Sequence, residues 1–166
     1  GFTQPRDQLI ARMLFESGAR VSEVLGLTSG DWRSRDLRER APAINKGSRG
    51  ERVKEIWWSS TTSQLLRNYI NDDRRWCDLE GRGLDDLPSS ARLFVTDEGK
   101  AYTYKAFSWN WRNACKKTNL KVTPHQARHW FVTMALHKFE SLPDDKRDAA
   151  RQSLIAYMGW RNPDTI

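Results

Sequence analysis

The segment from residue 123 to residue 129 carries two side chains suited to phosphate chemistry. His125 and Arg128 are three residues apart, so on a helix they would share one face. Pro124 suits the first turn of such a helix, and the free N–H groups at a helix N-terminus attract a phosphate. An imidazole and a guanidinium on that face predict a site that binds a phosphate group.

A metal site is the alternative for the same segment, because His125 and His129 are four residues apart. A zinc protease would have a glutamate beside the first histidine, whereas Gln126 cannot act as a general base. Cys77 and Cys115 lie far apart and outside any Cys-x-x-Cys pattern, which disfavours a cysteine zinc site and a disulfide scaffold. We therefore expect no metal here.

Three further segments carry candidate residues, and each has a plain structural alternative. Arg20 and Glu23 have the spacing of a local ion pair at the start of a helix. Lys46 precedes a predicted hairpin turn at residues 47–50; most such lysines are merely exposed, but a basic hairpin can also reach a DNA phosphate. Trp160 suits a core aromatic at a helix end, although its indole N–H can donate one hydrogen bond.

A mainly helical scaffold is expected to position these residues. Apolar spacing, caps and turn residues predict helices over residues 4–17, 21–27, 61–76, 103–117, 124–139 and 144–158. The same signals predict strands over 41–45 and 52–59, with a further strand and turn in 31–40. Gly18 and Gly159 are expected to end helices, and Asn162-Pro163 to begin one more. We expect an α+β, mainly α, domain with a small antiparallel three-stranded sheet near its N-terminal side.

Positive charge is concentrated in one part of this 166-residue chain, whose net charge is +7. Residues 99–139 contain eight Lys or Arg and no acidic residue, whereas the acids gather at 72–86 and 140–148. On charge alone, a solvated face and a nucleic-acid-binding face are equally good interpretations. No apolar run approaches the roughly 20 residues of a membrane span, and no signal peptide opens the chain. We expect a soluble, cytoplasmic domain.

Taken in order, the four segments resemble the tyrosine recombinase (phage integrase) family over residues 8–166. They correspond to its Ala-Arg-x-Ser-Glu box, Lys-Gly hairpin, Pro-His-x-x-Arg-His helix and Gly-His or Gly-Trp pair. The resemblance implies that residues 1–166 form a single catalytic domain fragment of bacterial or phage origin. The N-terminal core-binding domain and the C-terminal segment with the nucleophilic tyrosine would be absent. Family spacing places that tyrosine near position 169, a position that none of the internal tyrosines has.

The resemblance implies DNA cleavage and rejoining through a 3′-phosphotyrosine, with no cofactor and no metal. Arg20 and Arg128 would hold the non-bridging phosphate oxygens, because guanidinium groups match their geometry. Lys46 would protonate the leaving 5′-oxygen as a general acid. His125 would contact the phosphate and assist proton transfer, and Trp160 would donate its indole N–H to the phosphate.

The resemblance also implies partners and surrounding residues. The expected partner is double-stranded DNA, on which the full-length protein would act as a tetramer. Glu23 would orient the pocket without reacting. The residues expected to make further DNA contacts are Arg49, Lys105, Arg112, Lys116 and Lys117.

Two alternatives to the recombinase remain. A type IB topoisomerase would use the same chemistry without exchanging strands between partners. A non-catalytic DNA-binding or regulatory module would keep the fold alone. Without a nucleophile, this fragment itself is expected to bind DNA and not cleave it.

Overall fold

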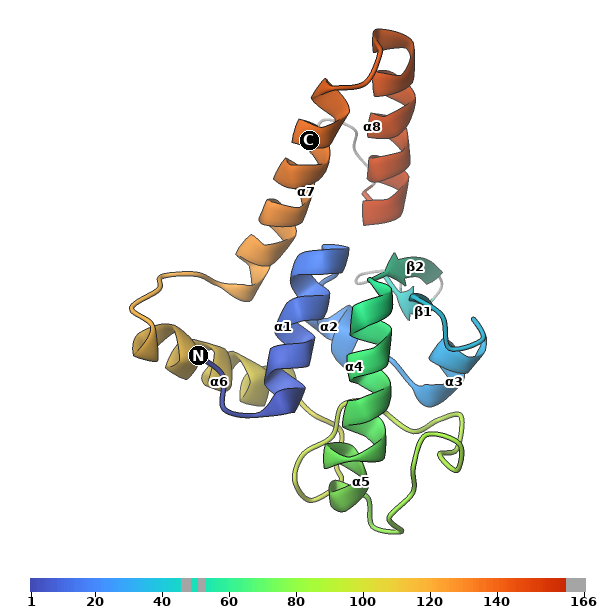
Figure 1. Ribbon diagram of the computed structural model, residues 1–166, viewed down its shortest axis with the longest axis vertical. Helices are drawn as coiled ribbons and strands as arrows, with labels where there is room; N and C mark the ends of the chain where they lie inside the picture. The colour runs from blue at the N-terminus through green and yellow to red at the C-terminus, as the bar shows by residue number, and fades with distance from the viewer. Residues whose placement is uncertain (46–48, 51–52, 161–166) are drawn as a thin grey trace.

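The structure is a computed structural model that describes residues 1–45, 49–50 and 53–160. Helices dominate, and one two-stranded antiparallel sheet accompanies them within this described part (Figure 1). The helices are α1 (Pro5–Ser17), α2 (Val21–Leu25), α3 (Ser29–Arg33), α4 (Ser60–Asn71), α5 (Asp73–Cys77), α6 (Tyr104–Lys117), α7 (Pro124–Glu140) and α8 (Asp144–Met158). The strands are β1 (Arg40–Ile44) and β2 (Val53–Trp57). Of the helices described, none has the length and apolar character needed to cross a membrane.

Helix α1 is the centre of the fold and contacts α2, α4, α6, α7 and β2. The large apolar side chains that it buries are Leu9, Ile10, Met13 and Leu14. The helix ends as predicted at Gly18, whose φ of 62° is left-handed and whose N–H donates to the Leu14 carbonyl at 3.0 Å. A β carbon at this position would lie 2.4 Å from the Phe131 ring. Glycine therefore lets α7 approach the end of α1 closely.

The sheet has two strands among the described residues, so the prediction of a third strand is wrong. The pairing runs from Arg40 opposite Trp57 to Ile44 opposite Val53. The third strand was expected within residues 31–40, but residues 29–33 form α3 and so occupy the start of that range. Thr28 accepts the Asp31 N–H at 3.1 Å, and the Asp31 carboxylate accepts the Thr28 N–H at 2.9 Å. This reciprocal capping box starts a helix.

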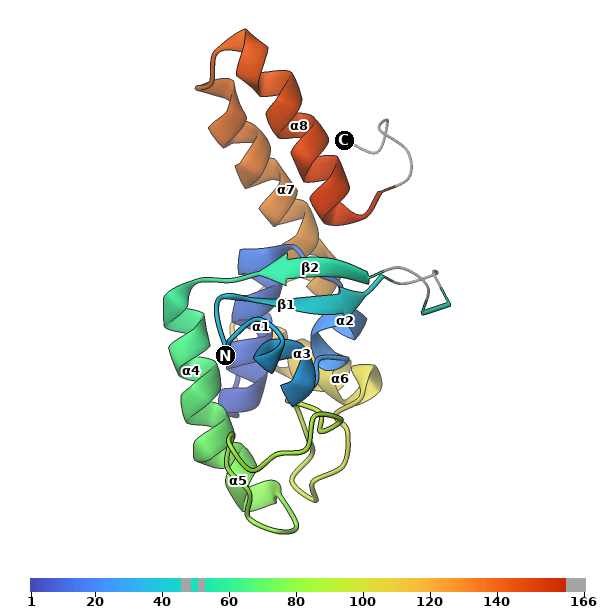
Figure 2. The same ribbon diagram turned by 90° about the vertical axis from the view of Figure 1, so that its right-hand side faces the viewer.

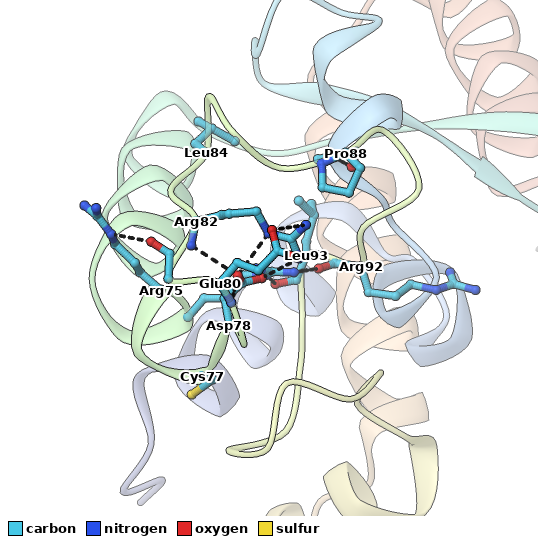
Figure 3. Close-up of polar contacts among 12 residues, drawn as sticks. Arg75, Cys77, Asp78, Glu80, Arg82, Leu84, Pro88, Arg92 and Leu93 are labelled. Atoms are coloured by element: carbon cyan, nitrogen blue, oxygen red, sulfur yellow. Dashed lines mark hydrogen bonds and ion pairs between the residues drawn. The ribbon is translucent and has the colours of Figure 1, made fainter.

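The helix predicted over residues 61–76 is two helices, because the backbone turns at Asp72, where ψ is −89°. The loop that follows is held by Asp78 (Figure 3). Its carboxylate accepts Nε–H and Nη2–H of Arg82, each at 3.0 Å, and the backbone N–H of Glu80 at 3.0 Å. These bonds, led by those from Arg82, hold the pKa of Asp78 well below its ordinary value. Part of the acidic charge of residues 72–86 is therefore paired locally.

Helices α7 and α8 form an antiparallel hairpin that projects from the body of the molecule (Figures 1 and 2). Both were predicted from the sequence, and α8 ends as expected at Gly159, with a left-handed φ of 68°. The base of the hairpin lies beside α1 and β2, and the connection between its helices lies at the far end. Arg128 near the start of α7 and Trp160 after α8 therefore meet at the base.

Candidate active site

Arg20, His125 and Arg128 line one cleft of about 440 Å³. The start of α2, the first turns of α7 and the first residue of α6 meet there. The remaining lining residues are Ala19, Val21, Ser22, Tyr104 and Pro124. The structure thus brings the first and third motifs of the sequence to the same place.

Arg20 enters the cleft from the N-cap position of α2. Its Nη1 donates to Oε1 of Glu23 at 3.1 Å and to Oδ1 of Asn45 at 3.0 Å. Its backbone N–H donates to Oε2 of Glu23 at 2.8 Å. Within the described structure these side-chain bonds use Nη1 alone, and the side chain is 28% exposed. The Nε–H and Nη2–H groups thus remain as donors for a ligand.

Glu23 lies behind Arg20 and has a second cation beside it. Its side chain is fully buried, and Nζ of Lys54 lies 3.0 Å from its Oε2. Burial lowers the pKa of Lys54, and the Glu23 carboxylate opposes this effect. Lys54 is not among the residues predicted from the sequence. The available signal was the alternation of β2, which turns Lys54 and Ile56 inward.

Arg128 is held by the ends of two helices. Its Nη1 donates to the Gly18 carbonyl at 2.7 Å and its Nη2 to the Met158 carbonyl at 2.9 Å. Carbonyls at helix C-termini lack helical partners, so a buried guanidinium satisfies them. Burial, together with the charge of Arg20, lowers the pKa of Arg128 to about 10, which leaves it charged at neutral pH. Its Cζ lies 5.5 Å from the centre of the Trp160 ring.

Asn45, which is also absent from the residues predicted from the sequence, connects the first and last motifs. Its amide accepts from Arg20 and donates from Nδ2 to the Gly159 carbonyl at 3.3 Å. A β carbon at residue 159 would lie 2.7 Å from that Nδ2, so glycine permits the contact. The next residue, the predicted Lys46, lies outside the described residues, as do residues 47–48 of the hairpin turn and the predicted helix start at 162–163.

His125 is exposed at the mouth of the cleft. Partial burial of the ring, followed by the charges of His129, Arg128 and Arg20, lowers its pKa. The His125 and His129 rings meet edge to face with their centres 4.7 Å apart. Within the described ranges, His, Cys, Asp and Glu side chains form no group of three or more that could hold a metal ion.

The four tyrosines differ in their surroundings. Burial raises the pKa of Tyr69 and that of Tyr157 to about 12. The Tyr157 hydroxyl donates to the Ser17 carbonyl at 2.8 Å, and that of Tyr102 to Asp7 at 2.7 Å. Tyr104 alone among the four is exposed, at 57%, and lines the cleft. Its side chain is therefore a candidate contact for a bound phosphate ester.

The basic residues predicted on α6 do not all share one face. Phe107, Trp111 and Ala114 are buried as predicted. The opposite, exposed stripe consists of Lys105, Trp109, Arg112 and Lys116. Lys117 is also exposed but lies about 100° around the helix from Lys116. Arg49 is exposed near the hairpin turn.

The sequence model of the phage integrase family matches residues 2–141 of this chain. The TnP I resolvase of Bacillus thuringiensis is 20% identical over 161 residues, which cover 97% of this chain and 51% of the resolvase. The tyrosine recombinase XerA of Pyrococcus furiosus is 29% identical over 136 residues, covering 80% of this chain and 42% of XerA. The chain thus spans about half the length, or less, of these relatives.

Solved structures have the same fold. The crystal structure of XerA recombinase covers 98% of this chain with a TM-score of 0.70 and 22% identity, over 52% of its own length. XerH site-specific recombinase, in a post-cleavage complex with its palindromic difH substrate, covers 97% with a TM-score of 0.67 and 16% identity, over 40% of its own length. With a profile match over most of its residues and this fold, the chain belongs to the phage integrase family of tyrosine recombinases.

Proposed function

We propose that this chain is the catalytic domain of a longer site-specific recombinase or integrase that cleaves and rejoins duplex DNA. The observation that carries the proposal is the cleft in which Arg20, Arg128 and His125 meet. Two guanidinium groups and an imidazole suit the charge and hydrogen-bonding geometry of a phosphodiester. DNA as the partner is supported by a solved structure of the same fold, the Tn1549 transposon integrase in complex with circular intermediate DNA.

In the proposed reaction a tyrosine hydroxyl attacks the scissile phosphorus and the bond to the 5′-oxygen breaks. The products are a 3′-phosphotyrosine and a 5′-hydroxyl, and a 5′-hydroxyl on a partner strand reverses the step. Arg20 supplies its Nε–H and Nη2–H to a non-bridging oxygen. Arg128, held by two carbonyls, supplies a fixed positive charge behind the same phosphate. Fixed donors of this kind stabilise charge that develops in the transition state.

The remaining roles concern proton transfer and contacts outside the cleft. Lys46 protonates the leaving 5′-oxygen, and His125 assists the loss of the tyrosine proton. Trp160 packs against Arg128 and donates its indole N–H to the phosphate. The exposed stripe of α6 contacts the DNA backbone beside the cleft, which adds Trp109 to the predicted Lys105, Arg112 and Lys116. Lys117 and Arg49 make further phosphate contacts.

The nucleophile belongs to the part of the protein that follows this chain, near position 169. We further propose that the complete protein acts as a tetramer on DNA and that residues 1–166 alone bind DNA without cleaving it. A type IB topoisomerase activity is the second candidate, because the cleft chemistry would be the same. Exchange of strands between two DNA molecules separates the recombinase from the topoisomerase.

The test is a nicked suicide substrate, from which the cleaved strand cannot be resealed. The complete protein should form a covalent protein–DNA adduct in the presence of EDTA. Tyr104→Phe should still form it, whereas replacing the tyrosine near position 169 by phenylalanine should abolish it. No adduct from the wild-type protein would refute the enzyme, and an adduct lost in Tyr104→Phe alone would relocate the nucleophile into the cleft.

The role of Lys46 has a separate test. Lys46→Ala should slow cleavage, and a substrate with sulfur in place of the 5′-bridging oxygen should recover much of the loss, because a thiolate leaves without a proton. Arg20→Ala should not be rescued by this substrate. Equal rescue of both variants would contradict the assignment of Lys46 as the acid.

A further inference from the structure

We propose that Lys54 is a positioning residue for Arg20: its buried ammonium group balances the charge of Glu23, so that the guanidinium of Arg20 stays available to the phosphate. This inference rests on the proposed function. Lys54 does not line the cleft, so it acts through Glu23 and not on the DNA.

The Glu23 carboxylate divides its two oxygens between the two cations. Oε1 accepts from Nη1 of Arg20 at 3.1 Å. Oε2 lies 3.0 Å from Nζ of Lys54 and also accepts the Arg20 backbone N–H at 2.8 Å. The Glu23 side chain is 0% exposed and that of Lys54 is 7% exposed. Because water is excluded from this contact, the charge of the carboxylate must be met by these partners.

The position of Lys54 on β2 explains how its side chain reaches Glu23. It also shows that a charged residue stands where an apolar one would fit. Lys54 pairs with Ala43 of β1, and the inward face of the sheet otherwise carries the buried apolar residues Ala41, Ala43 and Ile56. An apolar residue would fit this face without the desolvation cost of an ammonium group. A lysine at this place is compensated by Glu23, directly behind the cleft.

The consequence for Arg20 is electrostatic. With Lys54 present, two cations share one carboxylate, and the positive charge of Arg20 is only partly cancelled. Without Lys54, Arg20 becomes the sole ion-pair partner that Glu23 has in the described structure. The carboxylate would then neutralise the guanidinium and hold it away from the phosphate. Lys54 thus increases the charge that Arg20 presents to the cleft.

The first test compares two suicide DNA substrates with the complete protein. One has an ordinary scissile phosphate, and the other has a methylphosphonate, which lacks the negative charge that Arg20 meets. Lys54→Met should reduce the cleavage rate on the phosphate by about tenfold to a hundredfold, by analogy with residues that orient the ligands of a metal ion. On the methylphosphonate the loss should be much smaller, as for Arg20→Ala. Lys54→Arg should restore part of the rate.

The control is Lys146→Met, which removes one exposed lysine at the start of α8 and should leave both rates unchanged. An equal loss on both substrates would mean that Lys54→Met only damages the fold, and no loss at all would mean that Glu23 needs no second cation. Either result overturns the inference. If Lys54→Met does not fold, Glu23→Gln/Lys54→Met removes both buried charges, so no carboxylate remains to neutralise Arg20. Its cleavage rate on the phosphate should then stay close to that of the wild type, and a loss as large as that of Arg20→Ala would overturn the inference.

A second measurement needs no cleavage and separates this inference from the proposed function. Inorganic phosphate is titrated into the protein while the ¹⁵N signal of the Arg20 guanidinium is followed by NMR. Lys54→Met should weaken phosphate binding by about tenfold, a change of about 1.4 kcal/mol, whereas Lys146→Met should not. Equal affinities would overturn the role of Lys54. If phosphate affinity differs between the wild type and Lys54→Met but the complete protein forms no DNA adduct, the proposed recombinase function is refuted and the role of Lys54 is not.

Discussion

Two arginine–carboxylate pairs in this molecule look alike in sequence and in exposure, yet they differ in what their arginines can bind. Arg20 pairs with Glu23 three residues away, and Arg82 pairs with Asp78 four residues away. The arginine side chains are 28% and 29% exposed, and the carboxylates are 0% and 5% exposed. Neither spacing nor accessibility distinguishes a structural pair from a candidate catalytic one.

The difference lies in how many guanidinium nitrogens are occupied. Arg82 gives Nε and Nη2 to Asp78, and its Nη1 lies 3.5 Å from a Glu80 oxygen (Figure 3). Among the described residues, Arg20 gives only Nη1 to side-chain partners, and it lines a cleft with Arg128 and His125. Free donors that converge with other cations on a cleft are thus the better indication of a phosphate site.

The largest expected effect separates these two arginines. Arg20→Ala should lower formation of the covalent DNA adduct by about a hundredfold or more, because a charged donor to the transition state is lost. Arg82→Ala should leave the rate close to that of the wild type. The measurement is single-turnover cleavage of the suicide substrate by the complete protein. Similar rates for the two variants would remove the distinction between the pairs.

A smaller effect is expected on stability, and here Arg128 should exceed Arg20. Arg128→Ala leaves the carbonyls of Gly18 and Met158 buried without their donor, at a cost of about 2–4 kcal/mol in the free energy of unfolding. Arg20→Ala should cost about 1 kcal/mol in the free energy of unfolding, because Glu23 keeps Lys54 and Asn45 keeps Gly159 as partners. Urea unfolding of both variants measures this. A loss for Arg128→Ala no larger than that for Arg20→Ala would contradict the role of Arg128 at the two helix ends.

The contribution of the Asp78–Arg82 pair to the stability of the fold should depend on pH. Because the folded-state pKa of Asp78 lies below its ordinary value of 3.8, its stabilising contribution is complete above that pH. This contribution is lost as the pH falls from there towards the folded pKa. Thermal unfolding of wild type and Asp78→Asn should therefore differ near neutral pH and converge in acid. If the difference in melting temperature between wild type and Asp78→Asn is the same at every pH, the paired carboxylate does not stabilise the loop.

The smallest expected effect is on the titration of His125. Its pKa is lowered first by partial burial, and then by the charges of His129, Arg128 and Arg20. Arg20→Ala should raise that pKa slightly, and Arg128→Ala should raise it more. NMR titration of the His125 ring protons measures both, with Arg82→Ala as the control. If the pKa of His125 is unchanged in both arginine variants, the charges of Arg20 and Arg128 do not influence it.

The sequence predicted most helices, because motifs and caps are local signals. That Arg20 and His125 line one cleft was expected only from the resemblance to the family. The predicted helices did not include α3, although the Thr28–Asp31 capping box that starts it is also local. Lys54 and Asn45 are a different case. Their importance depends on strand register and on a contact between residues 114 positions apart, which only a folded chain defines. The position of Lys117 off the stripe formed by Lys105, Arg112 and Lys116 follows from the helical period, so the sequence already contained that distinction.

In the hairpin of α7 and α8, the candidate site lies at the base and the connection between the two helices lies at the opposite end. Arg128 and Trp160 meet at the base, whereas the connection at residues 141–143 lies at the far end (Figure 2). Two antiparallel helices can lengthen or shorten together by whole turns without moving residues at their base. The tip is therefore a natural place for insertions of variable length, and for a fluorescent label or affinity tag that leaves the cleft undisturbed.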